Sequence, residues 1–179
     1  ITGMPIHRYA EIDFMGFRNV IDILGGVEFD VPINMNYDDP YQDLSIHLKK
    51  GLQHLDGKQA EGLVRFRATY VNGDADRIKM QQAFLKELFK QKIKPQYITK
   101  AKDLINQMYQ HMRTNMSVAE ALSYVGILKN LTDESIETYT LPGDSKYMNN
   151  ISYFIYDTEK TKQMILEHFG YPEEEAKKL

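Results

Sequence analysis

Apolar side chains recur at helical spacing in several segments of the chain. In residues 12–24, IDFMGFRNVIDIL, the apolar positions share one helical face, and Gly25-Gly26 then stop the helix. Ser117 opens a capping box, SVAE, and Asp157 can cap a helix that Gly170 ends. Together with these signals, the spacing predicts further helices at about 58–66, 76–92, 98–112, 117–128 and 157–169.

Strands are expected where polar and apolar residues alternate or where β-branched and aromatic residues gather. These segments are VEFDV (27–31), residues 44–48, IETYTL (136–141) and ISYFIYD (151–157). The segment NMNYDDPYQD (34–43) reads as a loop because it is rich in Asn, Asp and Pro. Turns are expected at Lys50-Gly51, at 72–74 and at Pro142-Gly143-Asp144.

The alternation of strands and helices predicts an α/β or α+β sandwich. At 179 residues the chain fits one domain, and it contains no internal repeat or linker. We expect a single domain over residues 1–171, followed by a charged tail at 172–179.

Composition narrows the possible functions. The formal net charge of −3 gives no general attraction to nucleic acid, whose binding proteins usually carry a basic face. Without cysteine, the chain has no disulfide, thiolate metal site or cysteine nucleophile. No run of eighteen apolar residues exists, and the chain opens on ITGMPIHRY without an initiator methionine. We therefore expect a piece of a longer protein, with any membrane anchor outside it.

Three arginines gather in VRFRATYVNGDADRIKMQQ. Arg65 and Arg67 project to the same side if their segment is extended. Arg77 and Gln81 are four residues apart, so they share a face near the start of the next helix. If the turn at 72–74 folds the halves together, four donors converge beside a helix N-terminus, which favours an anion such as phosphate. Asp74 can cap that helix or pair with an arginine.

Each of these features also has an ordinary explanation. The arginines can lie on a solvated face or pair with some of the 25 acidic residues, and their spacing matches no generic phosphate motif. The apolar side chains after Arg77 can belong to the core or to a pocket for a lipid that carries a phosphate. The aspartates of 37–43 can form a solvated turn or bind a hard cation, although EF-hand spacing is absent.

Three segments, read in order, resemble the LytR-CpsA-Psr family of cell-envelope proteins. They are YAEIDFMGFRNVIDILGGVEFDVP (9–32), YDDPYQDLSIHLKKGLQHLDGKQAEGLVRFR (37–67) and NGDADRIKMQQAFL (72–85). The resemblance covers residues 5–90 most distinctively. It implies an α-β-α sandwich with a mixed central sheet and a hydrophobic pocket for a polyprenyl chain.

The resemblance further implies an extracellular transferase, held by a membrane anchor and typical of Gram-positive bacteria. Such a protein attaches an anionic glycopolymer, of the teichoic acid or capsule type, from a polyprenyl-pyrophosphate carrier to peptidoglycan. The site residues then become Arg65, Arg67, Arg77 and Gln81 as phosphate ligands, with Arg65 and Arg67 as the catalytic pair. Asp74 would support them, and Phe14, Phe84, Leu85 and Leu88 would line the lipid pocket.

Two departures from the family pattern limit what this chain is expected to do. Met80 stands where the family often has a basic residue directly before the glutamine. The resemblance implies that the family's N-terminal part, with the aspartates expected to bind Mg²⁺ or Mn²⁺ and to activate the acceptor, lies upstream of this chain. We therefore expect no metal ligands in the chain, and the chain alone can be inactive.

Two rival functions stay open. One is a non-catalytic module that holds polyprenyl phosphate for a partner enzyme, because every feature inside the chain is compatible with binding alone. The other is an envelope-linked transcriptional regulator. The net charge and the lack of a recognisable helix-turn-helix argue against nucleic acid as a partner.

Overall fold

The computed structural model describes residues 4–67, 74–94, 101–128, 130, 132 and 135–170. These residues fall into two compact units, Arg8–Glu137 and a second unit made of Ile1–His7 with Thr138–Leu179. The division leaves the single-domain boundary at 171 a prediction, and the tail at 172–179 lies outside the described residues.

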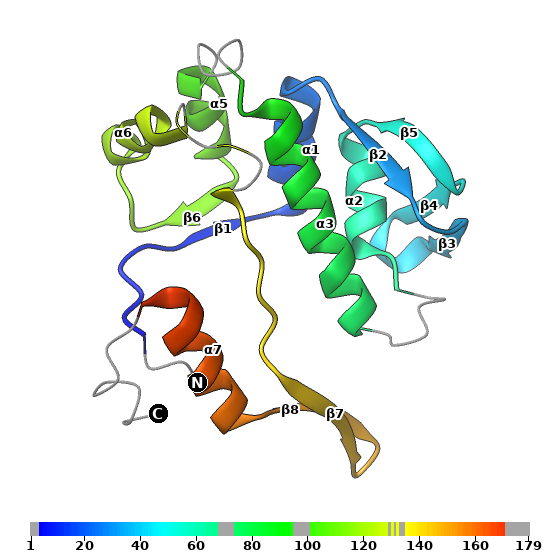
Figure 1. Ribbon diagram of the computed structural model, residues 1–179. Helices are drawn as coiled ribbons and strands as arrows, with labels where there is room; N and C mark the ends of the chain where they lie inside the picture. Colours follow the sequence, from blue (N-terminus) through cyan, green and yellow to red (C-terminus); the bar gives the residue numbers. More distant parts are fainter. Residues whose placement is uncertain are drawn as a thin grey trace. The chain divides into compact units, whose positions relative to one another are not determined.

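The larger unit alternates short strands with helices (Figure 1). Its elements in chain order are β1 (Ala10–Ile12), α1 (Phe14–Ile23), β2 (Val27–Val31), β3 (Met35–Asp39), the 3₁₀ turn η1 (Pro40–Gln42), β4 (Leu44–Leu48), β5 (Gly51–Leu55), α2 (Gly57–Arg65), α3 (Asp74–Lys92), α5 (Ala101–Met108), β6 (Met112–Thr114) and α6 (Val118–Leu128). The smaller unit contains β7 (Gly143–Met148), β8 (Ile151–Tyr156) and α7 (Thr158–Phe169).

The strands β2 to β5 form one long antiparallel ribbon with a break in it. β2 pairs with β5 and β3 pairs with β4, and the break separates the pair Val31–Gly51 from the pair Met35–Leu48. Three residues of one side, 32–34, therefore lie opposite two residues of the other, 49–50, which is the arrangement of a β-bulge. Pro32 lies at this break because it has no N–H to donate to a ladder.

The described strands pair in twos, and all four pairs are antiparallel. The mixed central sheet that the resemblance implied is therefore not formed among the described residues. In the ribbon and in the β7–β8 hairpin, the chain turns back on itself, and such a local return produces antiparallel pairing.

The core of the larger unit lies between the ribbon and helices α1, α2 and α3. β2 and β4 each bury alternate side chains and expose those between, as expected for a sheet covered on one face. The ring of Phe84 on α3 is fully buried, and its centroid lies 5.9 Å from that of Phe17 and 5.7 Å from that of Phe29. The core cluster comprises Ile21, Val27, Phe29, Val31, Met35, Leu44, Ile46, Leu48, Leu55, Ala60, Leu63, Phe66 and Phe84.

The helices begin where capping side chains are available. Asp13 accepts a hydrogen bond from the backbone N–H of Gly16 at 2.7 Å and so caps α1. Asp56 and Gln59 form a reciprocal capping box at the start of α2. Asp157 caps α7, which ends at Gly170 in the left-handed conformation as predicted.

Most predicted helices and strands are confirmed, and the predictions for three segments are wrong. The segment 34–43 contains strand β3, because pairing with β4 satisfies the backbone of a polar sequence. The segment 136–141 is not a strand, and β7 instead begins at Gly143, inside the predicted turn. Met112, predicted as the last residue of the 98–112 helix, instead begins strand β6, which pairs with β1, and α5 already ends at Met108.

The hairpin of the smaller unit turns at Asn149 and Asn150. Both residues have positive φ, 51° and 63°, which is the requirement of a tight two-residue hairpin turn. Asparagine tolerates this conformation better than other residues with a side chain. The pair of asparagines is therefore the local signal for this hairpin, and the sequence analysis missed it.

Candidate functional site

Two of the three arginines come from the C-terminal end of α2. The helix ends at Arg65, and Phe66 then adopts an extended backbone with φ −61° and ψ 135° while its side chain enters the core. Because Phe66 points inward, Arg65 and Arg67 both line a cavity on the other side of the chain. The predicted shared side is confirmed, although Arg65 lies in a helix and not in a strand.

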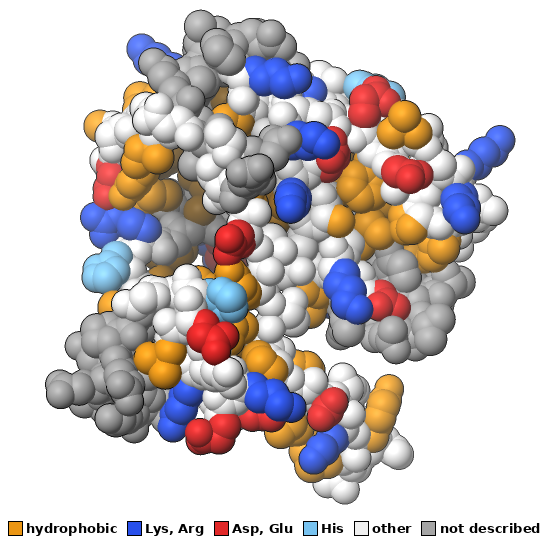
Figure 2. Space-filling model, in the orientation of Figure 1, with side chains coloured by type: hydrophobic (Ala, Val, Ile, Leu, Met, Phe, Trp, Pro, Cys, Tyr) orange, Lys and Arg blue, Asp and Glu red, His pale blue; other side chains and the backbone are white. Residues whose placement is uncertain are grey.

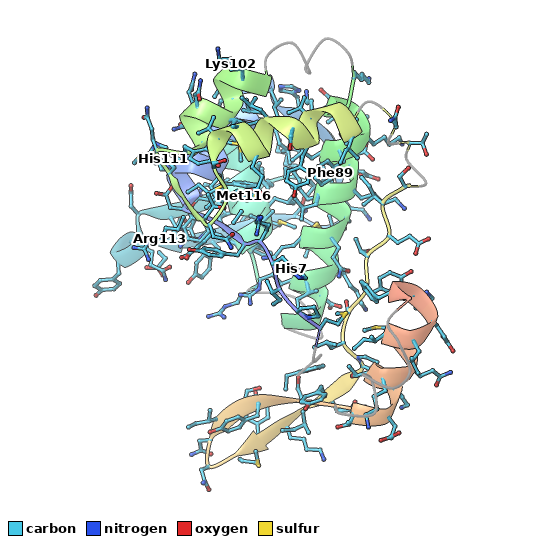
Figure 3. The ribbon with its side chains drawn as sticks, turned by 90° about the vertical axis from the view of Figure 1, so that its left-hand side faces the viewer. His7, Phe89, Lys102, His111, Arg113 and Met116 are labelled. Carbon is cyan, nitrogen blue, oxygen red and sulfur yellow. The ribbon has the colours of Figure 1, made fainter. Side chains whose placement is uncertain are left out.

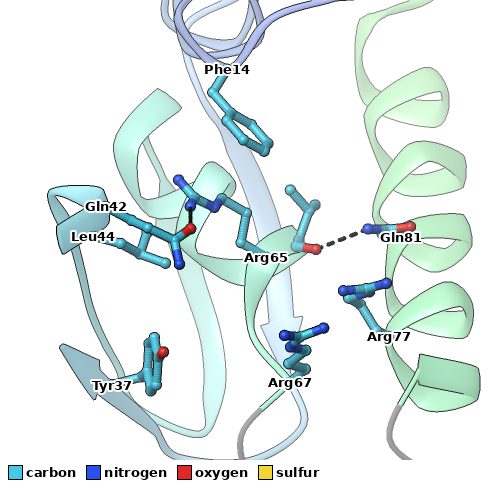
Figure 4. A pocket seen from close by; sticks show the side chains of 9 residues that line it. Phe14, Tyr37, Gln42, Leu44, Arg65, Arg67, Arg77 and Gln81 are labelled. Carbon is cyan, nitrogen blue, oxygen red and sulfur yellow. Dashed lines mark hydrogen bonds between the residues drawn. The ribbon is translucent and has the colours of Figure 1, made fainter. Parts of the chain in front are cut away.

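Helix α3 supplies the other two donors. Arg77 and Gln81 lie one turn apart near the start of this helix and line the same cavity (Figure 4). The predicted convergence of the four side chains is therefore confirmed. The cavity has a volume of about 430 Å³ and is lined by Phe14, Tyr37, Gln42, Leu44, Val64, Arg65, Arg67, Arg77 and Gln81.

The turn that was expected to fold the two halves together lies outside the described residues. Asn72 and Gly73 are not described, and Asp74 is described as the first residue of α3 without its side chain. The supporting role of Asp74 therefore stays a prediction. The start of α3 nevertheless places the positive end of the helix dipole near Arg77.

Arg65 is held on three sides. Its Nη1 donates to Oε1 of Glu61 at 2.7 Å. Its Nη2 donates to Oε1 of Gln42 at 2.7 Å, as Figure 4 shows. The ring of Phe14 packs against its guanidinium, with 4.3 Å from Cζ to the ring centroid. The side chain is 15% exposed, so its orientation is set by these neighbours more than by solvent.

Glu61 is the buried carboxylate of the site, with an exposed fraction of 1%. One oxygen accepts from Arg65, and the other accepts from Nε of Arg18 on α1. Burial alone would raise the pKa of Glu61, but the hydrogen bonds and charges of Arg18 and Arg65 outweigh it and hold the pKa below its ordinary value. Glu61 is therefore ionised at neutral pH and carries one negative charge between two positive ones.

Gln42 is fixed by the loop that precedes β4. Its Nε2 donates to Oδ2 of Asp39 at 2.7 Å, and Oδ1 of Asp39 accepts from the backbone N–H of Tyr41 and Gln42. Asp38, on β3, accepts from the hydroxyl of Ser45, its partner on β4, at 2.7 Å. The carboxylates of Asp38 and Asp39 therefore accept hydrogen bonds from neighbouring residues of the ribbon, which agrees with the prediction that the aspartates of 37–43 form a turn. Among the described residues, no three His, Asp or Glu side chains are grouped to hold a metal ion.

Gln81 links the two helices that carry the arginines. Its Nε2 donates to the backbone carbonyl of Val64 at 2.9 Å, which is one of the carbonyls at the C-terminal end of α2 (Figure 4). This hydrogen bond holds α3 against the last turn of α2, next to Arg65. In this conformation Gln81 has a structural partner in addition to its place in the cavity wall.

A second cavity, of about 410 Å³, is lined almost entirely by apolar side chains. Helix α3 contributes Leu85, Leu88 and Phe89 to it, and Phe89 is labelled on this helix in Figure 3. The complete lining consists of Ile12, Phe17, Val20, Ile21, Leu24, Leu85, Leu88, Phe89, Lys92, Ile93, Leu104, Ile105, Met108 and Val125.

The four residues predicted for a lipid pocket fall into three places. Leu85 and Leu88 line the apolar cavity. Phe84 is fully buried in the core, and Phe14 lies against Arg65 in the arginine cavity. A lipid-contacting role for any of them stays a prediction.

Arg18, Gln42 and Glu61 belong to the site, although the sequence did not single them out. Glu61 lies four residues before Arg65, so helical spacing could have indicated the pair. Arg18 and Gln42 are far from Arg65 in the sequence, and no local pattern connects them to it. Arg18 and Gln42 reach Arg65 and Glu61 only because α1 and the segment 37–43 pack against α2.

Basic side chains are dispersed on the face shown in Figure 2. Lys and Arg lie there with Asp and Glu among them, and they do not merge into a broad basic patch. This dispersion agrees with the net charge of −3. The predicted absence of a nucleic-acid partner stays a prediction. No helix in the described part of the chain is long and apolar enough to cross a membrane.

Comparisons with known proteins agree with the sequence resemblance. TagV of Bacillus subtilis, named polyisoprenyl-teichoic acid–peptidoglycan teichoic acid transferase, is 30% identical over 174 residues, which cover 94% of this chain and 44% of that protein. A TagU of Bacillus cereus with the same transferase name is 26% identical over 161 residues, covering 90% of this chain and 51% of that protein. The chain thus spans about half the length of these curated relatives.

The solved structures support the same fold class. The crystal structure of B. subtilis TagV superposes with a TM-score of 0.75 and covers 94% of this chain and 66% of the TagV chain. This similarity confirms the predicted mixture of helices and strands. The model of the LytR_cpsA_psr family matches residues 1–168. The chain therefore belongs to the LytR_cpsA_psr family.

Proposed function

We propose that this chain is part of a transferase that moves a glycopolymer from a polyprenyl-pyrophosphate carrier to peptidoglycan. The transferase names of the TagV and TagU relatives support this proposal. A teichoic acid or a capsule polymer would be the cargo, and the arginine cavity would hold the pyrophosphate. The membrane-anchored, extracellular position and the Gram-positive source belong to the same proposal.

One observation carries the proposal. A single face of α3 runs from the arginine cavity to the apolar cavity, because Arg77 and Gln81 line the first while Leu85 and Leu88 line the second. Gln81 and Leu88 are about 10 Å apart along the helix axis. Helix α1 does the same, since Phe14 borders the arginine cavity and Phe17 borders the apolar one. Such an arrangement suits a ligand with an anionic head and an apolar tail.

The chemistry proposed for this site is displacement at phosphorus. A sugar hydroxyl of the acceptor forms a new O–P bond to the phosphate that carries the glycopolymer, and polyprenyl phosphate leaves with the electrons of the broken P–O bond. Arg77 and Gln81 would anchor the phosphates while Arg65 and Arg67 stabilise the charge that develops during transfer. Fixed guanidinium groups suit this task because they stay charged and match phosphate geometry.

A divalent metal, Mg²⁺ or Mn²⁺, is part of the proposal only outside the described residues. No group of three or more His, Asp or Glu side chains among the described residues could hold such an ion. We propose that its ligands, together with the base that activates the acceptor, lie in another part of the whole protein.

A binding experiment tests the head-and-tail arrangement. We expect geranylgeranyl pyrophosphate to bind the 179-residue chain more tightly than either inorganic pyrophosphate or geranylgeraniol, as measured by isothermal titration calorimetry. Arg77→Ala should lower the affinity for both geranylgeranyl pyrophosphate and inorganic pyrophosphate by about 10-fold or more, because a charged hydrogen bond is lost. Lys79→Ala is the matched control, since Lys79 lies half a turn away on the same helix and is 73% exposed.

The outcomes separate the proposed function from its rivals. Equal affinity for geranylgeranyl pyrophosphate and pyrophosphate would show that the apolar cavity takes no tail. Failure of both to bind would contradict the anion site itself. Transfer of glycopolymer by the full-length protein, lost in Arg65→Ala and dependent on a divalent metal, distinguishes an enzyme from a module that only holds the carrier.

A further inference from the structure

Glu61 occupies an unusual place for a carboxylate beside an anion site. Its side chain is 1% exposed, lies on the last turns of α2 and accepts hydrogen bonds from two arginines on different helices. Arg65 lines the arginine cavity, whereas Arg18 is not among the residues that line it. The negative charge of Glu61 therefore lies directly behind one of the groups proposed to bind phosphate.

Electrostatics alone would make this carboxylate unfavourable for anion binding. A negative charge next to Arg65 lowers the positive potential that a phosphate meets in the cavity. A positioning effect acts in the opposite direction, because a guanidinium already held in its binding geometry loses less conformational freedom when the ligand arrives. When the charge of Glu61 is removed, the electrostatic effect predicts tighter phosphate binding and the positioning effect predicts weaker phosphate binding. A measurement of the affinity therefore decides between them.

The geometry favours positioning. Glu61 holds Nη1 of Arg65, and Gln42 holds Nη2, each at 2.7 Å, so two separate elements fix the guanidinium plane. Phe14 covers one face of that plane. A guanidinium has five N–H donors, and these contacts leave the others for a ligand. Arg18, on α1, holds the second oxygen of Glu61 and thereby prevents the carboxylate from turning.

We propose that Glu61 is a positioning residue of the arginine cavity, which fixes Arg65 for phosphate binding and is itself fixed by Arg18. This inference rests on the proposed function, because it concerns the same anion site. Glu61 touches no ligand in this scheme and acts through Arg65. Glu61 contributes by holding Arg65 in its binding geometry before the ligand arrives. A binding side chain generally needs such supporting contacts from residues that do not touch the ligand.

The test uses inorganic pyrophosphate and the 179-residue chain at neutral pH. We expect Glu61→Gln to weaken pyrophosphate binding by about 10-fold, because a glutamine amide offers one oxygen and cannot accept from both arginines. Glu28→Gln is the matched control and should leave the affinity unchanged within about twofold, since Glu28 pairs with His54 on the exposed side of the ribbon. In an Arg65→Ala background, Glu61→Gln should have no further effect, as a double-mutant cycle requires for residues that act together.

A spectroscopic readout separates positioning from a loss of stability. The guanidinium resonances of Arg65 should report restricted rotation in the wild type and free rotation in Glu61→Gln, with thermal unfolding confirming that the variant is folded. If Glu61→Gln does not fold, Arg18→Gln takes its place and should weaken pyrophosphate binding several-fold.

The results that overturn the inference are distinct from those that overturn the proposed function. A wild-type chain that does not bind pyrophosphate contradicts the proposed function and the inference with it. A wild-type chain that binds, with affinity unchanged or increased in Glu61→Gln, contradicts the inference alone, and increased affinity identifies Glu61 as a repelling charge. The inference is also overturned if Glu61→Gln lowers pyrophosphate affinity equally in the wild type and in the Arg65→Ala background. If Arg18→Gln is used because Glu61→Gln does not fold, unchanged or increased pyrophosphate affinity in Arg18→Gln also contradicts the inference.

Discussion

Gly57, at the start of α2, lies against the backbone carbonyl of Arg18 on α1. A Cβ atom at Gly57 would overlap the backbone of Arg18, and the N–H of Gly57 donates to Oδ1 of Asp22 at 2.7 Å. The two helices approach this closely only because residue 57 has no side chain. This approach brings Arg18 within reach of Glu61, and through Glu61 it bears on Arg65.

Substitution of Gly57 by alanine should therefore push α1 away from α2. We expect a loss of about 1–3 kcal/mol in the free energy of unfolding, typical of overpacking, together with weaker pyrophosphate binding. Gly126→Ala is the control, because a Cβ there meets nothing within 4 Å. In the α6 helix that change should stabilise by about 0.5–1 kcal/mol. Urea denaturation measures both, and equal effects of the two substitutions would contradict the close approach.

Phe84 and Phe89 should differ in what they contribute. Phe84 is fully buried between two other rings, so Phe84→Ala should cost about 3–5 kcal/mol of unfolding free energy. Phe89 is 39% exposed and lines the apolar cavity, so Phe89→Ala should cost much less stability. It should instead weaken binding of geranylgeranyl pyrophosphate without affecting inorganic pyrophosphate. A stable Phe84→Ala chain, or a Phe89→Ala chain with full lipid affinity, would argue against these placements.

The ion pairs of Glu61 should make stability depend on acid pH. The pKa of Glu61 is lower in the folded chain than in an unfolded one, because the hydrogen bonds and charges of Arg18 and Arg65 outweigh its burial. The stabilisation is therefore fully present above the unfolded pKa and disappears as the pH falls through the folded pKa. The difference in unfolding free energy between wild type and Glu61→Gln should be constant from pH 7 to about pH 5 and shrink below that. A difference that grows towards acid pH would mean that burial dominates and that the pKa is raised.

The capping box of α2 should matter for stability at the end opposite to the arginines. Asp56→Ala removes the acceptor for the N–H of Gln59 and should lower the free energy of unfolding by about 1 kcal/mol. Since Arg65 is anchored by Glu61 and Gln42, pyrophosphate affinity should change by less than twofold. Asp157→Ala, which removes the cap of α7 in the smaller unit, should leave that affinity unchanged. A large loss of binding in Asp56→Ala alone would mean that fraying of α2 reaches Arg65.

Local signals in the sequence predicted much of the fold. The capping residues Asp157 and Ser117, the Gly25-Gly26 stop and the alternation in 27–31 all act between near neighbours, so their effect survives without knowledge of the rest of the chain. The convergence of Arg65, Arg67, Arg77 and Gln81 was also predictable, because two short-range spacings and the order of the family segments indicated it.

Long-range packing decided the rest. The polar strand β3 exists because its backbone pairs with β4, and Phe84 is a core residue because two distant rings enclose it. Glu61 can be buried because α1 places Arg18 against it, and Arg65 is oriented because η1 places Gln42 against it. The sequence by itself indicated that Arg65, Arg67, Arg77 and Gln81 come together at one cavity, whereas only the tertiary structure decided how they are held. The reason is that burial and charge pairing depend on residues far apart along the chain.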